Sequence, residues 1–203
     1  MNLITIFHYH LLPGGVTNVI LQGASALIHH LPGIDRIRLV CGSAENTENI
    51  KTRLEAELPA DPAEINVEII VEPRIGYADR NVPIEQDEIS SFSRQLLDKY
   101  GGGLWWIHNY QLGKNPLFTA AIVHIAENHK KQKLLLQIHD FPECARYSNL
   151  EKLNKAGIRD PYPVSENTIY SLINERDRKI ITESGIPADK AVLLNNPVED
   201  KPP

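Results

Sequence analysis

Residues 3–20 read LITIFHYHLLPGGVTNVI, and this stretch decides the fold. The apolar residues 3–7 predict a buried strand, and the spacing of Val16, Val19 and Ile20 predicts an amphipathic helix. Between them, the pair Gly14 and Gly15 predicts a turn with dihedral angles that other residues avoid, open to close approach by a ligand. A helix that begins there directs its free N–H groups at an anion such as a phosphate. The alternative is a tight turn with no ligand.

The rest of the chain repeats this strand-to-helix pattern. Apolar runs predict strands at residues 2–9, 35–41, 65–71, 104–107, 133–138, 168–173 and 190–194. Helical periodicity predicts a first helix that ends near residue 30, helices over 44–58, 84–100 and 175–184, and another that begins near residue 116. Residues 143–163 give no assignment. This alternation predicts an α/β fold with a doubly wound, mostly parallel, Rossmann-like sheet of about seven strands.

Composition excludes several classes of protein. The 203 residues are 42% hydrophobic, and 21 Lys and Arg against 26 Asp and Glu give a net charge of −5. This balance argues against a nucleic-acid partner. Cys41 and Cys144 have no spacing typical of zinc or disulfide sites. No apolar run resembles a signal peptide or a transmembrane segment, so we expect a cytoplasmic protein, compatible with peripheral contact at a membrane.

Polar residues follow most of the predicted strands. In parallel sheets ligands bind outside the carboxyl ends of the strands, so these residues are expected on one rim. Together with the glycines found there, they are Gly14, Gly15, Gly42, Ser43, Arg74, His108, Asn109, Tyr110, His139, Asp140, Asn174, Glu175, Arg176, Asn195 and Asn196.

Each candidate has a chemical and a structural interpretation. His139 is suited to exchange a proton with a sugar hydroxyl or phosphate, with Asp140 orienting the ligand; the alternative is a strand-end histidine bonded to backbone. Arg74 and Arg80 are suited to hold a phosphate or carboxylate, or are solvated loop charges. The run 108–110 offers donors, acceptors and a ring to a polyhydroxylated ligand, or forms a turn that needs Asn109.

Known nucleotide and catalytic motifs are missing from the sequence. The first turn lacks G-x-G-x-x-G, and the second strand ends in Cys41 rather than an acidic residue, which excludes the dinucleotide fingerprint. Neither a P-loop nor G-x-S-x-G occurs. His8 and His10 share one strand face, but no third metal ligand is evident, so we expect no metal site.

Six short motifs in order resemble the N-terminal domain of a GT-B fold glycosyltransferase, most closely the retaining enzymes of family 4. They are PGGV (13–16), HNY (108–110), HDF (139–141), NERDR (174–178), SGIP (184–187) and NNPV (195–198). The resemblance implies transfer of a sugar, of hexosyl type, from a nucleotide sugar to a small-molecule or glycan acceptor, without a metal or other cofactor.

The resemblance also assigns roles to individual residues. Gly14 and Gly15 would lie against the donor diphosphate and the transferred sugar, and His139 would contact that sugar. The loops that hold Arg74, Arg80 and 108–110 would face the acceptor.

In that family a C-terminal domain with an Arg/Lys pair and an E-x7-E motif holds the nucleotide. We therefore expect residues 1–198 to form the acceptor-side domain and 199–203 to begin an interdomain linker, with the donor-binding domain absent from this chain. Such a half would not catalyse transfer alone. Two alternatives remain: half of a nucleotide-sugar epimerase, or a non-catalytic module that binds a sugar or phosphate.

Overall fold

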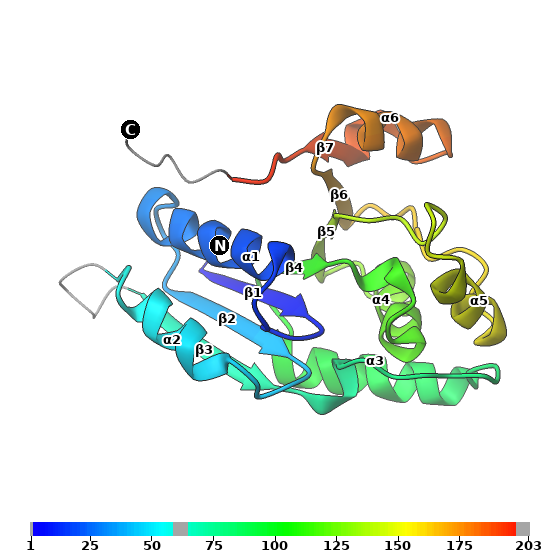
Figure 1. The fold of residues 1–203 in the computed structure, drawn as a ribbon, viewed down its shortest axis with the longest axis horizontal. Helices are drawn as coiled ribbons and strands as arrows, with labels where there is room; N and C mark the ends of the chain where they lie inside the picture. Colours follow the sequence, from blue (N-terminus) through cyan, green and yellow to red (C-terminus); the bar gives the residue numbers. More distant parts are fainter. Residues whose placement is uncertain (1, 59–64, 198–203) are drawn as a thin grey trace.

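A computed structural model describes residues 2–58 and 65–197 of the chain, and within them seven strands alternate with six α-helices (Figure 1). The strands are β1 Leu3–His8, β2 Arg36–Cys41, β3 Asn66–Val71, β4 Leu104–His108, β5 Lys133–Ile138, β6 Thr168–Leu172 and β7 Ala191–Leu193. The helices are α1 Gly15–His30, α2 Thr47–Glu55, α3 Gln86–Tyr100, α4 Pro116–Asn128, α5 Tyr147–Lys155 and α6 Glu175–Glu183. Short 3-10 turns lie at Pro73–Ile75, Tyr110–Leu112 and Ala188–Lys190.

The seven strands form one parallel sheet in the order β3-β2-β1-β4-β5-β6-β7. This confirms the predicted doubly wound, Rossmann-like α/β fold. The chain moves outward from β1 to β3, then returns to the centre and moves in the other direction from β4 to β7. Because parallel crossovers are right-handed, this reversal places α1 and α2 on one face and α3 and α4 on the other (Figure 1).

Strand register aligns the carboxyl ends of the central strands. Ile4 of β1 lies between Ile37 of β2 and Leu104 of β4, and Phe7 lies between Val40 and Ile107. The last residues of β1 and β2 are level with one another, as are His108 of β4 and Gln137 of β5. The loops that leave these strands therefore begin on one rim.

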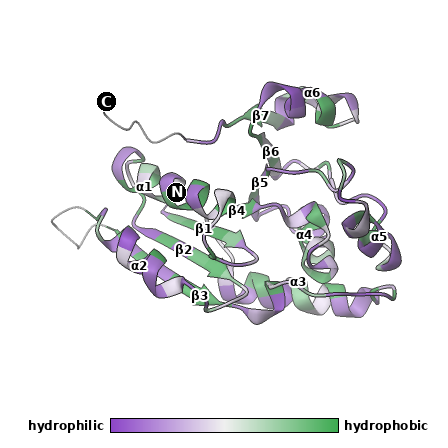
Figure 2. Ribbon diagram, viewed as in Figure 1, coloured by the Kyte–Doolittle hydropathy of each residue, from purple (hydrophilic) through white to green (hydrophobic). Residues whose placement is uncertain are grey.

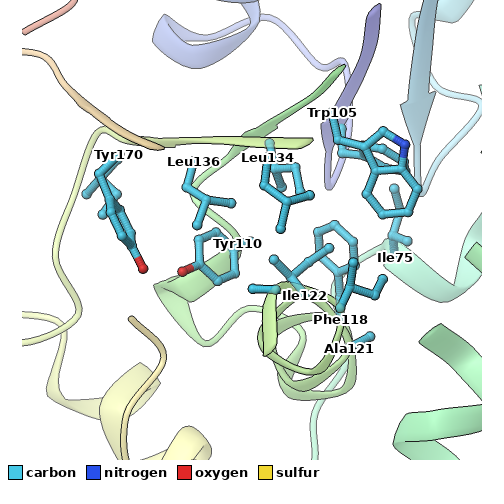
Figure 3. Close-up of a cluster of buried hydrophobic side chains, with 14 of the residues drawn as sticks. Ile75, Trp105, Tyr110, Phe118, Ala121, Ile122, Leu134, Leu136 and Tyr170 are labelled. Atoms are coloured by element: carbon cyan, nitrogen blue, oxygen red, sulfur yellow. The ribbon is translucent and has the colours of Figure 1, made fainter. Parts of the chain in front are cut away.

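Alternation along the strands builds a hydrophobic core on each face. Ile4 and Ile6 pack with Trp106 beneath α1 and α2, whereas Phe7 and Trp105 pack beneath α3 and α4. Figure 2 shows the apolar central strands between helices with mixed outer surfaces, and Figure 3 shows the second core around Phe118 and Leu136. The sheet is thus fixed from both sides at its centre.

Some expected boundaries shift in the structure. Residues 143–163, which gave no assignment, contain α5. The helix expected over 44–58 begins only at Thr47. The end of the expected domain at residue 198 and the expected linker at 199–203 lie outside the described residues. No helix in the described part of the chain combines the length and hydropathy needed to cross a membrane.

The contact between Gly42 and Gly76 gives a test of how the rim is built. A Cβ at Gly42 would lie 2.1 Å from the Gly76 Cα and 2.8 Å from the Tyr9 carbonyl oxygen. We expect Gly42→Ala to lower the free energy of unfolding by about 2 kcal/mol, because backbone atoms must move. The measurement is urea unfolding. Gly15→Ala is the matched control, since a Cβ there meets no atom within 4 Å; equal stability of the two variants would contradict the close approach.

Candidate functional site

The candidate site lies at the carboxyl ends of β1, β4 and β5, where the order of the strands reverses. β1 and β4 are neighbours in the sheet, yet the helices that follow them cover opposite faces. In open α/β sheets this reversal opens a crevice in which ligands bind. The side chains at these three strand ends are therefore the first candidates for chemistry.

Two histidines from neighbouring strands form a pair at this rim. His108 Nδ1 lies 3.0 Å from His139 Nε2, and the two rings are within 18° of parallel. His108 is fully buried, and its Nε2 has no partner among the described residues. His139 is partly exposed, and its Nδ1 makes no hydrogen bond with the described residues. The pair thus presents one nitrogen of His139 to a ligand.

The tautomers of the two rings are linked by the hydrogen bond between them. If His108 donates its Nδ1 proton to His139, then a neutral His139 carries its own proton on Nδ1 and offers a donor. If His139 donates instead, its Nδ1 is a bare acceptor. The two neutral states therefore present opposite hydrogen-bonding groups to a hydroxyl at His139 Nδ1, and they interconvert only when His139 Nδ1 loses a proton and His108 Nε2 gains one.

His8 completes a group of three histidines on the same face of the sheet. Its Nδ1 lies 3.4 Å from the His108 carbonyl oxygen, and the two rings are 6.3 Å apart. The cause is the two-residue period of strands: His8 follows Ile6, and His108 follows Trp106, on the side covered by α1. Sequence reasoning noted His8 only as an incomplete metal ligand.

Burial keeps these three histidines neutral. Loss of solvent lowers the pKa of His8 to about 3, with a further contribution from nearby His10. Burial lowers the pKa of His139 to about 4, which the charge of Asp140 partly opposes. For His108 burial, followed by His139, lowers the pKa well below its usual value. At neutral pH the rings are hydrogen-bonding groups without charge, which suits sugar hydroxyls better than a phosphate.

Asn109 fixes the position of His139. Its backbone is left-handed, with φ of 53°, a conformation that Asn tolerates better than most residues. Its Oδ1 accepts hydrogen bonds from the backbone N–H of His139 at 2.8 Å and of Asp140 at 3.4 Å. Tyr9 OH donates to the Asn109 carbonyl at 2.9 Å. Asn109 is buried, so its role in the structure is to position the histidine rather than to face solvent.

The glycine pair corrects one expectation. Gly14 precedes α1 with φ of 170°, an extended conformation open to any residue, and Gly15 already belongs to the helix. Neither residue lies in the left-handed region that favours glycine, so the turn does not need glycine for its dihedral angles. What the pair provides is space: a Cβ at Gly15 would touch nothing within 4 Å, and Gly14 provides no side-chain cap. The first N–H groups of α1 are therefore uncovered by side chains.

The two predicted arginines are engaged elsewhere. The guanidinium of Arg74 lies 4.2 Å from the centre of the Phe92 ring and bonds Gln95, both on α3. Arg80 makes two hydrogen bonds to Glu88, at 2.9 and 2.7 Å. The structure thus does not bring either arginine to the histidine pair. Their part in acceptor binding stays a prediction.

Tyr110 and Asp140 also differ in their surroundings. Tyr110 is fully buried among the apolar side chains of the second core, as Figure 3 shows, and its hydroxyl donates to the Pro161 carbonyl at 2.6 Å. Asp140 stays half-exposed at the rim, where it forms an ion pair with Arg146 at 3.0 Å. Of the predicted residues, the structure gathers His108, Asn109, His139 and Asp140 and leaves Tyr110 in the core.

Residues that sequence reasoning did not select also lie at this rim. His10 Nε2 lies 3.0 Å from the Tyr77 hydroxyl, and Lys114 lies 5.0 Å from the Tyr77 ring centre. The sequence analysis weighed His10 only as a metal ligand, and for Tyr77 and Lys114 the only available signal was a position after a strand. Within residues 2–58 and 65–197, no group of three or more His, Cys, Asp or Glu side chains is arranged to hold a metal. The expectation of metal-free chemistry stays a prediction.

Comparison with known proteins gives one relative with substantial sequence identity. The chain is 32% identical, over 203 residues, to a mannosylglucosyl-3-phosphoglycerate synthase from Petrotoga mobilis. The match covers 98% of this chain and 38% of that protein, so the chain spans well under half the length of its curated relative. No family model matches the chain.

Solved structures share the fold. The crystal structure of Anabaena HepE in complex with UDP and glucose superposes with a TM-score of 0.50 at 11% identity. That match covers 98% of this chain and 45% of the other. At this identity the likeness supports the Rossmann-like architecture alone.

The Asn109 contact yields a stability prediction. We expect Asn109→Ala to lower the free energy of unfolding by about 2–4 kcal/mol, because alanine is strained at positive φ and two buried N–H groups lose their acceptor. Asn109→Gly is the matched control: it removes the acceptor and relieves the strain, so it should cost less. Urea unfolding of both variants is the measurement. An alanine variant as stable as the parent would show that Asn109 does not hold residues 139 and 140.

The neutral histidines predict a pH dependence of stability. Below pH 6.5, the ordinary histidine pKa, the unfolded chain binds protons that folded His8 and His108 do not. The free energy of unfolding should therefore fall as pH decreases from 7 to 5, by up to about 1.4 kcal/mol per pH unit for each withheld proton. Urea unfolding at several pH values measures the slope. His8→Gln should reduce that slope by about one proton, and an unchanged slope would contradict a neutral buried His8.

Proposed function

We propose that this chain is the acceptor-side half of a GT-B glycosyltransferase of the family 4 type, which transfers a hexosyl group from a nucleotide sugar to an acceptor. The observation that carries the proposal is the neutral His108–His139 pair at the strand reversal, with one nitrogen of His139 open to a ligand. The similarity to a mannosylglucosyl-3-phosphoglycerate synthase over nearly the whole chain supports it. The product in that name carries two hexoses, which agrees with hexosyl transfer.

In this proposal His139 contacts the transferred sugar. A neutral imidazole is able to donate to, or accept from, a sugar hydroxyl, and the His108 partner lets it adopt either role without a net change in charge. Asn109 holds the backbone at residue 139, so the ring does not need to be ordered when the ligand binds. His139 thus orients the sugar beside the bond that breaks.

The start of α1 is the proposed contact for the donor diphosphate. The N–H groups there carry no side-chain cap, no acidic residue stands in the first turn, and the positive end of the helix dipole faces the diphosphate. The absent Cβ atoms at Gly14 and Gly15 leave room for phosphate oxygens. We propose that a C-terminal domain supplies most of the nucleotide contacts and that no metal or other cofactor takes part.

A substitution series in the complete protein tests the proposal. His139→Ala and His139→Gln should lower kcat by about a hundredfold or more, because the interaction acts on the reacting sugar. His124→Ala on α4 is the matched control, since that histidine bonds Gln86 and Asn128 far from the strand ends. The measurement is acceptor-dependent release of nucleoside diphosphate.

The same assay separates the alternatives. Unchanged kcat in both His139 variants would contradict a role for this residue in transfer. Turnover without an acceptor and without release of nucleoside diphosphate would indicate an epimerase. Saturable sugar binding without turnover in the complete protein would indicate a non-catalytic binding module.

A further inference from the structure

The rim beside the histidines carries positive charge that the proposed function has not used. Lys114 follows the turn after β4, and Arg146 stands immediately before α5. Lys114 is part of none of the ion pairs found in the described residues, whereas Arg146 pairs with Asp140 through one guanidinium nitrogen. The other N–H groups of Arg146 stay available, and its side chain is 42% exposed.

Tyr77 contacts one of these cations, and the charge of the other acts on its hydroxyl. The Lys114 ammonium is 5.0 Å from the centre of its ring, and the charge of Arg146 lowers the pKa of its hydroxyl. Burial acts in the opposite sense and dominates, so the pKa of Tyr77 lies above its ordinary value and the hydroxyl stays protonated. Two cations and one O–H group thus come from three separate loops.

Hydrogen bonding at His10 leaves the Tyr77 proton free. The backbone N–H of Leu12 donates to His10 Nδ1 at 3.3 Å, which makes Nδ1 an acceptor and places the ring proton on Nε2. That Nε2 lies 3.0 Å from the Tyr77 oxygen and therefore donates to it. The hydroxyl hydrogen of Tyr77 is then left to donate to an acceptor, either solvent water or an oxygen atom of a bound anion.

The backbone holds this group in place without a ligand. The Ala78 N–H donates to the Lys114 carbonyl at 2.9 Å, and the Asn115 side chain donates to the Arg74 and Gly76 carbonyls at 2.8 and 2.6 Å. The loop that carries Tyr77 is thereby joined to the loop that carries Lys114. Tyr77 and Lys114 are therefore placed together before binding, which lowers the entropic cost of capturing an anion.

We infer that Tyr77, Lys114 and Arg146 form a binding site for an acidic group of the acceptor, either a phosphate or a carboxylate. The identification of the acidic group as part of the acceptor rests on the proposed function, whereas the binding of an anion does not. The site lies next to the sugar contact, because Asp140, the partner of Arg146, directly follows His139. An acceptor that places its acid on these three residues brings a hydroxyl of its sugar or glycerol part toward the histidine pair.

Calorimetric titration of the complete protein with 3-phosphoglycerate, a small acid with both groups, tests the site. We expect saturable binding that Lys114→Ala weakens about tenfold or more and Tyr77→Phe weakens about fivefold, since charge-assisted hydrogen bonds are lost. Lys114→Arg should restore most of the affinity. Lys152→Ala is the matched control, because that lysine lies on the neighbouring helix and pairs with Asp79.

Further titrations separate the sources of the anion. Glycerol 3-phosphate carries only the phosphate, and glycerate carries only the carboxylate. We expect at least one of them to bind, with an affinity that Lys114→Ala lowers. Equal affinities for the parent and Lys114→Ala, or no saturable binding of any of the three compounds, would overturn the inference. The inference would also be overturned if Lys114→Ala lowered the affinity for UDP or GDP alone, because the site would then bind the donor.

Failure here and failure of the proposed function have different signatures. Lys114-dependent binding of 3-phosphoglycerate in a protein without transferase activity would keep the anion site and reject the transfer. Transfer that is unaffected by Lys114→Ala and Tyr77→Phe, with equal KM for the acceptor, would keep the transfer and reject the site.

Discussion

The parallel pairing of β1 with both β2 and β4 is the constraint on which the rest of the structure depends. With a partner on each side, the backbone groups of β1 are satisfied, so the strand occupies the centre of the sheet. The chain leaves it toward β2 and returns beside it at β4. Right-handed crossovers then force helices onto opposite faces and leave the carboxyl ends of β1 and β4 uncovered between them.

The two-residue period of the strands decides which side chains reach this opening. In β1 and β4 the residues that alternate toward α1 are apolar inside the sheet, and a histidine stands at the strand end: Ile6 is followed by His8, and Trp106 by His108. The histidines therefore extend the hydrophobic core to the rim. Their low pKa values follow from that continuity, because the same burial that packs Trp106 removes solvent from the rings.

Sequence patterns predicted the strands, their order along the chain and the carboxyl-end rim, because these depend on local periodicity and on the handedness of parallel crossovers. They did not predict where long side chains point. Arg74 and Tyr110 follow strands as expected, yet one stacks on Phe92 and the other reaches Pro161, contacts between residues 18 and 51 positions apart. Such directions are set by distant packing partners, which a local pattern does not contain.

The glycine pair shows a related limit. Sequence alone indicates a turn with unusual dihedral angles, whereas the structure has an extended Gly14 and a helical Gly15. The positive φ that matters for the site belongs instead to Asn109, whose side chain is needed as an acceptor and so excludes glycine. At position 109 the left-handed backbone and the need for a side-chain acceptor together select asparagine. The identity of one residue in the sequence does not show which of the two requirements it meets.

Residues 8–10 join the neutral and the charged parts of the rim. His8 contacts the His108 carbonyl, Tyr9 bonds the carbonyls of Asn109 and Tyr110, and His10 bonds Tyr77. His8 and Tyr9 thus both hold residues 108–110, whereas His10 contacts the loop that carries Tyr77. In the proposed function neutral imidazoles hold a sugar and cations hold an acid, and these two groups need different electrostatic surroundings a short distance apart. A single strand end that ties both to one rigid sheet supplies that separation without a change in conformation.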